Sequence, residues 1–185
     1  LCGGTLFRHI FFIERKMLPT IVVDNFFKDV NEIIKLSKKF KYFPPKKEEH
    51  WVGLRTKSLH INNYKLFNSI ILKILKFYFP TKNTAYENSF IYFHKLMPGC
   101  KKSNGETHYH TDSNIKLAGI IYLSNGNMKN GTTLFNKKKK KQIIVSNDLN
   151  TLVCYEGSKY HGPTLLDVNQ ERLTMNIFIK DIKIV

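Results

Sequence analysis

Three polar side chains in the second half of the chain have the types and spacing of metal ligands. His110 and Asp112 are separated by one residue, so in an extended strand both side chains point to the same face and converge on one point. His161, which lies between Tyr160 and Gly162, is a candidate third ligand. Two imidazoles and one carboxylate on one side of a transition metal leave its other positions open. The sequence therefore predicts a metal centre that has room for reacting molecules.

Other interpretations of these residues stay open. His108 would share the face of His110 and is an alternative ligand, although only His110 has the His-x-Asp spacing. Asp112 precedes a Ser-Asn pair and is also compatible with a turn. His94 belongs to a strand pattern and would face either the core or a cavity. The remaining histidines have no partner pattern and are His9, His50 and His60.

Arg172 is a candidate anion-binding residue a short distance after His161. A guanidinium can hold a carboxylate through two parallel hydrogen bonds, and it keeps its charge when buried. From Leu173 to Ile179, apolar residues alternate with other residues as in a strand. The alternative is a surface position for Arg172 at the start of that strand.

The order of these features resembles the Fe(II)/2-oxoglutarate-dependent oxygenases, and within them the prolyl 4-hydroxylase-like branch. The resemblance covers roughly the last hundred residues and depends on an ordered series of segments. These are Phe90-Ile91-Tyr92-Phe93, Pro98-Gly99, His110-Thr111-Asp112, Ala118 to Asn125, Gly131 to Phe135, Tyr160-His161-Gly162 and Arg172 to Phe178.

The resemblance implies a role for each candidate residue. The three metal ligands would hold Fe(II), and Arg172 would bind the distal carboxylate of 2-oxoglutarate, with Tyr122 and Thr174 as hydrogen-bonding helpers. The implied reaction is hydroxylation of a C–H bond in a protein side chain or small metabolite, with release of succinate and CO2. Fe(II) and 2-oxoglutarate are the implied cofactors, and ascorbate is a reductant that such a site can use.

Other positions bear on the substrate and the co-substrate. Met97 stands where some prolyl hydroxylases have a tyrosine, so one co-substrate contact is expected to be missing. Nothing in the sequence identifies a prolyl substrate. Trp51, the only tryptophan, and Arg55 are expected at the substrate entrance, whereas a packing role is the alternative for the aromatic ring.

Hydrophobic periodicity predicts two helices followed by many short strands. The first helix is expected over 28–39, begun by Asp24 or Asn25, and the second from Asn62 or Asn63 to the residue before Pro80. Between them, 42–49 is expected to be a loop and 51–61 an extended segment. Strands are expected at 21–23, 88–97, 116–123, 132–135, 142–146, 151–155 and 172–180. The pattern predicts a mainly β fold, a cupin-like double-stranded β-helix (jelly roll) with two supporting α-helices.

Composition indicates a folded chain with a strong positive charge. Its 185 residues are 42% hydrophobic, so we expect one oxygenase domain over 17–185 and a non-core N-terminal extension over 1–16. The net charge of +16 favours acidic neighbours. The strongest charge run, Lys137 to Lys141, is expected at an exposed hairpin tip, and nucleic acid is a less favoured partner because no aromatic residues alternate with these lysines. No segment is long and apolar enough for a membrane span.

Two other classes of function stay open. A cupin-like metal protein would bind metal without 2-oxoglutarate chemistry, and its Arg172 would point elsewhere. A basic polyanion-binding module would bind in a salt-sensitive way that survives loss of His110 and Asp112. Three scattered cysteines, Cys2, Cys100 and Cys154, do not form a disulfide framework, which favours a cytoplasmic location.

Overall fold

The computed structural model describes residues 17–49, 51–99, 109–125, 130–136, 138, 140–164 and 171–185. Some of the sequence-based expectations concern positions outside these ranges. Those positions are the N-terminal extension 1–16 with Cys2 and His9, and also His50, Cys100, His108, Lys137 and Lys139.

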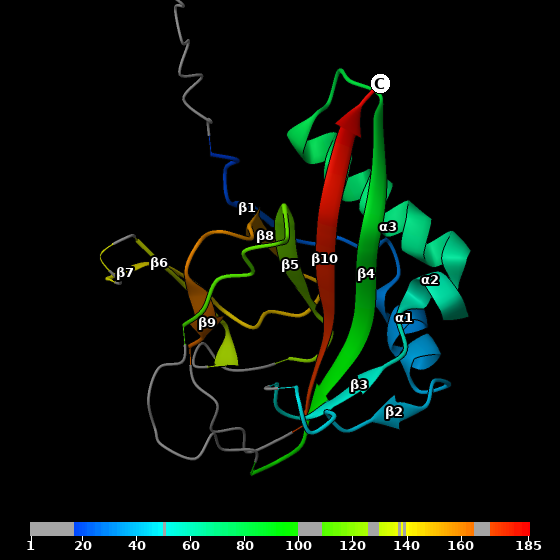
Figure 1. The fold of residues 1–185 in the computed structure, drawn as a ribbon. Helices are drawn as coiled ribbons and strands as arrows, with labels where there is room; N and C mark the ends of the chain where they lie inside the picture. Colours follow the sequence, from blue (N-terminus) through cyan, green and yellow to red (C-terminus); the bar gives the residue numbers. More distant parts are fainter. Residues whose placement is uncertain are drawn as a thin grey trace, which may run out of the picture.

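The described part of the chain is mainly β, with three helices before most of the strands (Figure 1). In chain order the elements are β1 (Ile21–Val23), α1 (Val30–Ser37), β2 (Tyr42–Phe43), β3 (Leu54–Thr56), α2 (Leu59–Asn62), α3 (Tyr64–Tyr78), β4 (Thr84–Leu96), β5 (Leu117–Tyr122), β6 (Thr132–Phe135), β7 (Lys141–Val145), β8 (Leu152–Glu156), β9 (His161–Pro163) and β10 (Arg172–Ile184).

These strands form two antiparallel sheets. The large sheet has seven strands in the order β1-β8-β5-β10-β4-β3-β2, and the small sheet has three in the order β7-β6-β9. A single bridge between His110 and His161 adds the segment around His110 to the β9 side of the small sheet. Buried side chains from both sheets pack together between them, namely Ala118, Tyr122, Leu134, Val145, Val153 and Tyr155. Two facing antiparallel sheets form the jelly roll, which confirms the expected fold class.

The helices cover the outer face of the large sheet. Figure 1 shows them together on the side of β4 away from the small sheet. The apolar stripe of α3 supplies the buried residues Ile70, Ile71, Ile74 and Leu75. They pack into the main hydrophobic core together with residues of the large sheet. Along each strand, these core residues alternate with the residues that face the small sheet. The large sheet is therefore held rigid from behind by a core that takes no part in the cavity in front.

The helix boundaries agree with the periodicity, but one expected cap was wrong. The N-cap of α1 is Asp29, whose Oδ1 accepts hydrogen bonds from the backbone N–H groups of Asn31 and Glu32 at 2.9 and 3.2 Å. Asp24 instead accepts from the Thr151 hydroxyl, and Asn25 has a left-handed backbone with φ of 52°. At α3 the expectation is confirmed, because Asn63 accepts from the N–H of Leu66.

Two short segments also differ from expectation. The extended segment expected over 51–61 is a strand only at β3, and its end turns into the one-turn helix α2 after Ser58. The hydroxyl of Ser58 accepts a hydrogen bond from the backbone N–H of Ile91, which ties this turn to β4. In the proline-containing segment expected to be a loop, Tyr42–Phe43 pairs with β3 as an edge strand.

Strand β10 divides the molecule, because its two faces have different neighbours. The residues Leu173, Met175, Ile177 and Ile179 belong to the core beneath the helices. The alternate residues line a cavity between the sheets and are Arg172, Thr174, Asn176 and Phe178. Neighbouring strands place further side chains on the same face as Thr174, because Thr174 is paired with His94 on β4 and with Tyr122 on β5.

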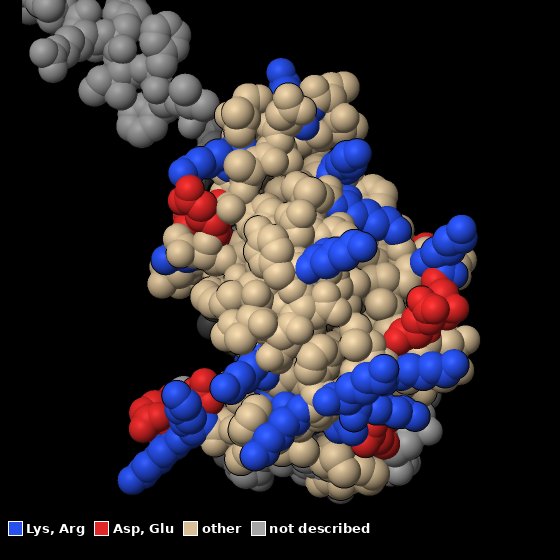
Figure 2. Space-filling view, turned by 90° about the vertical axis from the view of Figure 1, so that its right-hand side faces the viewer, with Lys and Arg blue, Asp and Glu red and all other residues tan. Residues whose placement is uncertain are grey.

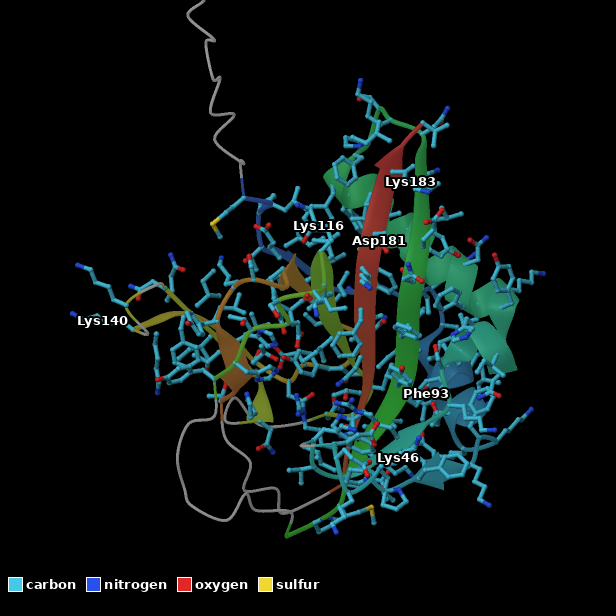
Figure 3. All side chains as sticks on the ribbon, viewed as in Figure 1. Lys46, Phe93, Lys116, Lys140, Asp181 and Lys183 are labelled. Atoms are coloured by element: carbon cyan, nitrogen blue, oxygen red, sulfur yellow. The ribbon has the colours of Figure 1, made fainter. Side chains whose placement is uncertain are left out.

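The charged residues form no single basic surface on the face that Figure 2 shows. Lys and Arg side chains lie there in separate groups, with Asp and Glu side chains among them. The expected lysine-rich hairpin is confirmed by the pairing of β6 with β7, and Lys140 lies at its projecting end (Figure 3). None of the helices in the described ranges has the length and apolarity that crossing a membrane requires.

Candidate active site

The structure brings the three candidate metal ligands together. The Nε2 atom of His161 lies 3.4 Å from Oδ2 of Asp112, and Nε2 of His110 lies 3.7 Å from Oδ1 of the same carboxylate. One ligand atom from each residue lies within 4.8 Å of the other two. His161 is buried, whereas the side chain of His110 is 59% exposed, so the cluster opens toward solvent on the His110 side.

Backbone hydrogen bonds place these ligands. His110 and His161 each donate a backbone N–H to the carbonyl of the other, both at 2.9 Å, so the two imidazoles lie on adjacent chain segments. Asp112 lies just beyond this bridge and outside any strand, at the start of a turn, which is the alternative that the sequence left open for it. Its N–H donates to the carbonyl of Gly157 at 2.8 Å. This hydrogen bond holds the Asp112 backbone in a position from which the carboxylate can reach both histidines.

Gly157 is required where it approaches Asp112. A Cβ atom at position 157 would collide with the backbone oxygens of Ile115 and Asp112. The segment after β8 therefore lies directly against the turn that follows Asp112, in which the N–H of Ile115 donates to the Asp112 carbonyl. Residue 157 thus helps to position the Asp112 carboxylate without being one of the candidate ligands.

Hydrogen bonding assigns the tautomer of His161. Its Nδ1 lies 2.9 Å from the carbonyl oxygen of Lys159, which can only accept, so Nδ1 carries the hydrogen. The lone pair of Nε2 then points toward Asp112 and is free to bind a cation. This arrangement, in which a ligating imidazole donates its other N–H to a backbone carbonyl, is usual for histidines that bind metals.

The donor set fits a divalent transition metal such as Fe(II). Two imidazoles and one carboxylate match the facial triad of non-haem iron sites. Neighbouring ligands about 2.1 Å from one metal lie roughly 3 Å apart, which is close to the observed separations of 3.4 and 3.7 Å.

A cavity of about 470 Å³ adjoins the three ligands. Its walls include apolar side chains from β5, β8 and β10, among them Ile120, Tyr155 and Phe178. It also contains two guanidinium groups, Arg55 and Arg172. The volume lies within the range of about 300–1,000 Å³ that is usual for small-molecule sites.

Arg172 lies at the start of β10, and its side chain points into this cavity. The residue is 7% exposed, and its Nε has no hydrogen-bond partner in the described part of the chain. Among the described residues no carboxylate forms an ion pair with it. Burial lowers the pKa of Arg172, an effect opposed by the nearby Tyr122, but the group stays charged at neutral pH. A buried cation without a counterion is suited to receive an anionic ligand.

Tyr122 and Thr174 flank Arg172 in different ways. The guanidinium carbon of Arg172 lies 5.5 Å from the ring centroid of Tyr122, which is fully buried and donates its hydroxyl hydrogen to Oγ1 of Thr132 at 2.7 Å. Tyr122 is not among the described residues that line the cavity, whereas Thr174 is one of them. The Thr174 hydroxyl donates to Oδ1 of Asn176 at 2.9 Å.

The two residues expected at the substrate entrance also line the cavity. The guanidinium carbon of Arg55 lies 4.4 Å from the Trp51 ring centroid, in cation–π geometry. The Trp51 ring in turn meets His94 edge-on, with ring centroids 5.9 Å apart. Both residues thus belong to the same chamber as the candidate ligands and Arg172.

His94 joins these groups through a chain of hydrogen bonds that the sequence did not predict. Its Nε2 lies 2.6 Å from the carbonyl oxygen of Val52, so Nε2 carries the hydrogen and Nδ1 accepts from the Asn176 amide at 3.3 Å. The chain continues from Asn176 to Thr174. Burial and then the charge of Arg55 lower the pKa of His94 to about 3, so it is neutral. The sequence left open whether His94 faces the core or a cavity, and the structure places it in the cavity wall.

Tyr155 is a second residue that sequence reasoning missed. Its ring centroid lies 4.7 Å from that of His161, and it is buried in the cavity wall. Burial, followed by the nearby Asp112, raises the pKa of its phenol, which stays protonated. No spacing signal relates Tyr155 to the ligands, because the contact comes from packing between the two sheets.

Comparison with known proteins identifies the fold. No protein-family model and no curated protein matches this sequence. Among solved structures, the non-heme alpha ketoglutarate dependent epimerase SnoN from nogalamycin biosynthesis is similar with a TM-score of 0.63 and 9% identity, over 88% of this chain and 77% of that chain. A 2OG-Fe(II) oxygenase family oxidoreductase from Burkholderia pseudomallei gives 0.60 and 7%, over 87% and 84%.

A prolyl-4-hydroxylase from Pseudomonas putida is also similar, with a TM-score of 0.57 and 13% identity over 89% of this chain and 93% of that chain. The similar structures are therefore 2-oxoglutarate- and Fe(II)-dependent oxygenases, prolyl 4-hydroxylases among them. At these identities the likeness establishes the shared fold, the double-stranded β-helix. The function of this chain has to be argued from its own site.

Proposed function

We propose that this chain is an Fe(II)- and 2-oxoglutarate-dependent oxygenase that hydroxylates a C–H bond of a protein side chain or small metabolite. The observation that carries the proposal is that one cavity holds two imidazoles, a carboxylate and the buried guanidinium of Arg172. The structural similarity to oxygenases of this type supports the same conclusion. One similar structure, that of SnoN, contains Fe3+ and alpha ketoglutarate.

In this proposal His110, Asp112 and His161 hold Fe(II). The Lys159 carbonyl keeps the hydrogen of His161 on Nδ1, so Nε2 is available to the metal. The Asp112 carboxylate offsets part of the charge of the ion. Together, Fe(II) and 2-oxoglutarate supply the activation of O2 that oxidises a C–H bond, with release of succinate and CO2.

Arg172 would bind the distal carboxylate of 2-oxoglutarate. Its planar donor groups match a carboxylate, and the pairing would satisfy a cation that is buried without a counterion. Tyr122 would hold the guanidinium in place from behind. The Thr174 hydroxyl would turn from Asn176 toward the bound carboxylate, since a hydroxyl hydrogen rotates to suit its acceptor.

The apolar walls would exclude water from the reacting groups. Ile120 and Phe178 come from adjacent strands of the large sheet, and Tyr155 packs against His161. A dry site strengthens the attraction between Arg172 and a carboxylate. A dry site also prevents side reactions with water.

The test is succinate formation from 2-oxoglutarate with Fe(II) and ascorbate, because turnover without the prime substrate needs no knowledge of that substrate. We expect activity in the parent protein and in Lys57→Gln, an exposed control, and loss of activity in His161→Ala and Arg172→Gln. Anaerobic titrations complete the experiment. Metal binding without 2-oxoglutarate binding would favour a cupin-like metal protein, and binding of neither would overturn the proposal.

A further inference from the structure

Arg55 is a second cation in the cavity and comes from a different part of the large sheet. It lies opposite His94 in the pairing of β3 with β4, and His94 lies opposite Thr174 in the pairing of β4 with β10. Residues that are paired in this way point to the same face of a sheet. The Arg55 side chain therefore lies in the same row as Thr174, on the β3 side of the cavity.

The segment that carries Arg55 is held close to β4. Gly53 has φ of +94°, and a Cβ atom there would collide with the backbone oxygen of Lys95. The neighbouring Val52 carbonyl accepts the hydrogen bond from His94, and the Trp51 ring meets His94 edge-on. Because Trp51 is fixed in this way, the guanidinium of Arg55 above its ring has a defined position before any ligand binds.

Arg55 has no counterion within the described residues. Its Nε is buried without a hydrogen-bond partner, and no carboxylate forms an ion pair with it. Burial lowers the pKa of Arg55, while Tyr92, Glu49 and Asp112 favour its charged form from a distance. If Arg172 takes the distal carboxylate of 2-oxoglutarate, Arg55 stays available for a second anion near the metal ligands.

We propose that the prime substrate is a small molecule with a carboxylate group, which Arg55 binds from its position over the Trp51 ring. This inference rests on the proposed function and narrows its substrate class. The cavity of about 470 Å³ also has to hold 2-oxoglutarate, which leaves room for a small acid. A single guanidinium balances a single carboxylate, whereas a phosphate monoester would keep a second negative charge unpaired in a half-buried place.

Trp51 provides the measurement, because it is the only tryptophan in the chain and lies beneath Arg55. The full-length protein is loaded with Zn(II), which does not support turnover, and saturated with 2-oxoglutarate. Its tryptophan fluorescence is then titrated with acetate and acetamide, with benzoate and benzamide, and with inorganic phosphate. Each acid and its amide have nearly the same shape, so a difference between them reports the carboxylate charge.

We expect each acid to change the fluorescence at a concentration at least about tenfold lower than its amide, since a charge-assisted pair is stronger than a neutral one. Arg55→Gln should bring this ratio close to one. Arg55→Lys should keep part of it, because lysine retains the charge without the planar donors. Lys57→Gln, which removes a neighbouring exposed charge, should match the parent protein.

Several results would overturn the inference. They are equal binding of acid and amide, no binding of either, tighter binding of phosphate than of acetate, or an unchanged acid preference in Arg55→Gln. Calorimetric titration of 2-oxoglutarate separates this inference from the proposed function. Loss of 2-oxoglutarate affinity in Arg55→Gln as large as in Arg172→Gln would assign Arg55 to the co-substrate, whereas absence of 2-oxoglutarate binding in the parent would refute the proposed function itself.

Discussion

The Nε2 atom of His161 lies 3.4 Å from Oδ2 of Asp112, although the two residues belong to segments far apart in the sequence. The contact depends on two backbone links: the bridge between His110 and His161, and the bond from the Asp112 N–H to the Gly157 carbonyl. Neither link involves a side chain of the cluster. The candidate ligands are therefore placed by the fold itself, and their side chains can be replaced one at a time to test their roles.

Asp112→Asn should strongly weaken metal binding while leaving the fold intact. Asparagine has the same shape but lacks the negative charge that attracts a divalent cation. We expect the affinity for Co(II), measured by titration calorimetry, to fall by more than the roughly 10–100-fold that follows loss of a group hydrogen-bonded to a ligand. Asp181→Asn is the control, because Asp181 lies on the far part of β10 (Figure 3). Parent-like affinity in Asp112→Asn would exclude Asp112 as a ligand.

Gly157→Ala should disturb the site without touching a ligand side chain. The added methyl group would collide with the carbonyls of Ile115 and Asp112, so the segment must move away. We expect a loss of roughly 1–3 kcal/mol in the free energy of unfolding, as for other overpacked positions, and weaker Co(II) binding. Urea unfolding and calorimetry measure the two effects. Ser158→Ala, at the exposed neighbouring position, should change neither, and an unaffected Gly157→Ala would refute the packing argument.

Tyr122→Phe should affect stability more than co-substrate binding. The change removes the buried hydrogen bond to Thr132, which should cost about 1–2 kcal/mol in the free energy of unfolding. Because Tyr122 lies behind Arg172, we expect 2-oxoglutarate affinity to fall only a few-fold. Tyr86→Phe, which loses a hydroxyl bond to Asn68 on the helix side, should leave that affinity unchanged. A loss in Tyr122→Phe as large as in Arg172→Gln would show direct contact with the carboxylate.

The stability of the protein should depend on pH through His94. Burial, then the charge of Arg55, lowers its pKa from 6.5 to about 3 in the folded state. Below pH 6.5 the unfolded chain therefore takes up a proton that the folded chain does not, so the free energy of unfolding decreases as the pH falls. Between pH 6.5 and about 4.5 this loss should be roughly 2 kcal/mol. Above about pH 7.5 His94 is neutral in both states, and its contribution is constant.

His94→Gln tests this dependence, because glutamine does not titrate. Urea unfolding at several pH values between 4.5 and 7 should give a shallower decrease for the variant than for the parent protein. All other titrating groups are common to both proteins, so the difference between their slopes isolates His94. Equal slopes would mean that His94 is not held neutral in the folded protein.

The sequence was sufficient to predict the jelly roll because its signals are local. Strand alternation at β10 and the apolar stripe of α3 each mark the face that packs against the core. The end of the segment 51–61 was wrong because the cause is distant: Ser58 accepts a bond from Ile91 of β4, and the chain turns into α2. The early part of β4 was missed because its residues before Ser89 are exposed or half-buried and have no apolar alternation.

The site residues were predicted in two ways: His110 and Asp112 from their spacing, and the roles of His161 and Arg172 from the resemblance of the ordered segments. His110 and Asp112 are two positions apart, and a sequence pattern can include that relationship. The chain of hydrogen bonds from Thr174 through Asn176 to His94 depends on the register between β4 and β10. That register is a relationship between two strands, so the sequence of either strand alone does not reveal it. For the same reason the packing of Tyr155 on His161 had no sequence signal.

The lysine-rich hairpin has a consequence for how the protein behaves at high concentration. Strand β7 lies at the edge of the small sheet, where one side of its backbone has no partner strand in the described sheet. An open edge can recruit an edge strand of another molecule, and lysines at such an edge discourage this through their charge and hydration. The described lysines of the hairpin are all exposed, namely Lys138, Lys140 and Lys141. Protection against association at this edge is therefore one role for their charge, and it involves no bound polyanion.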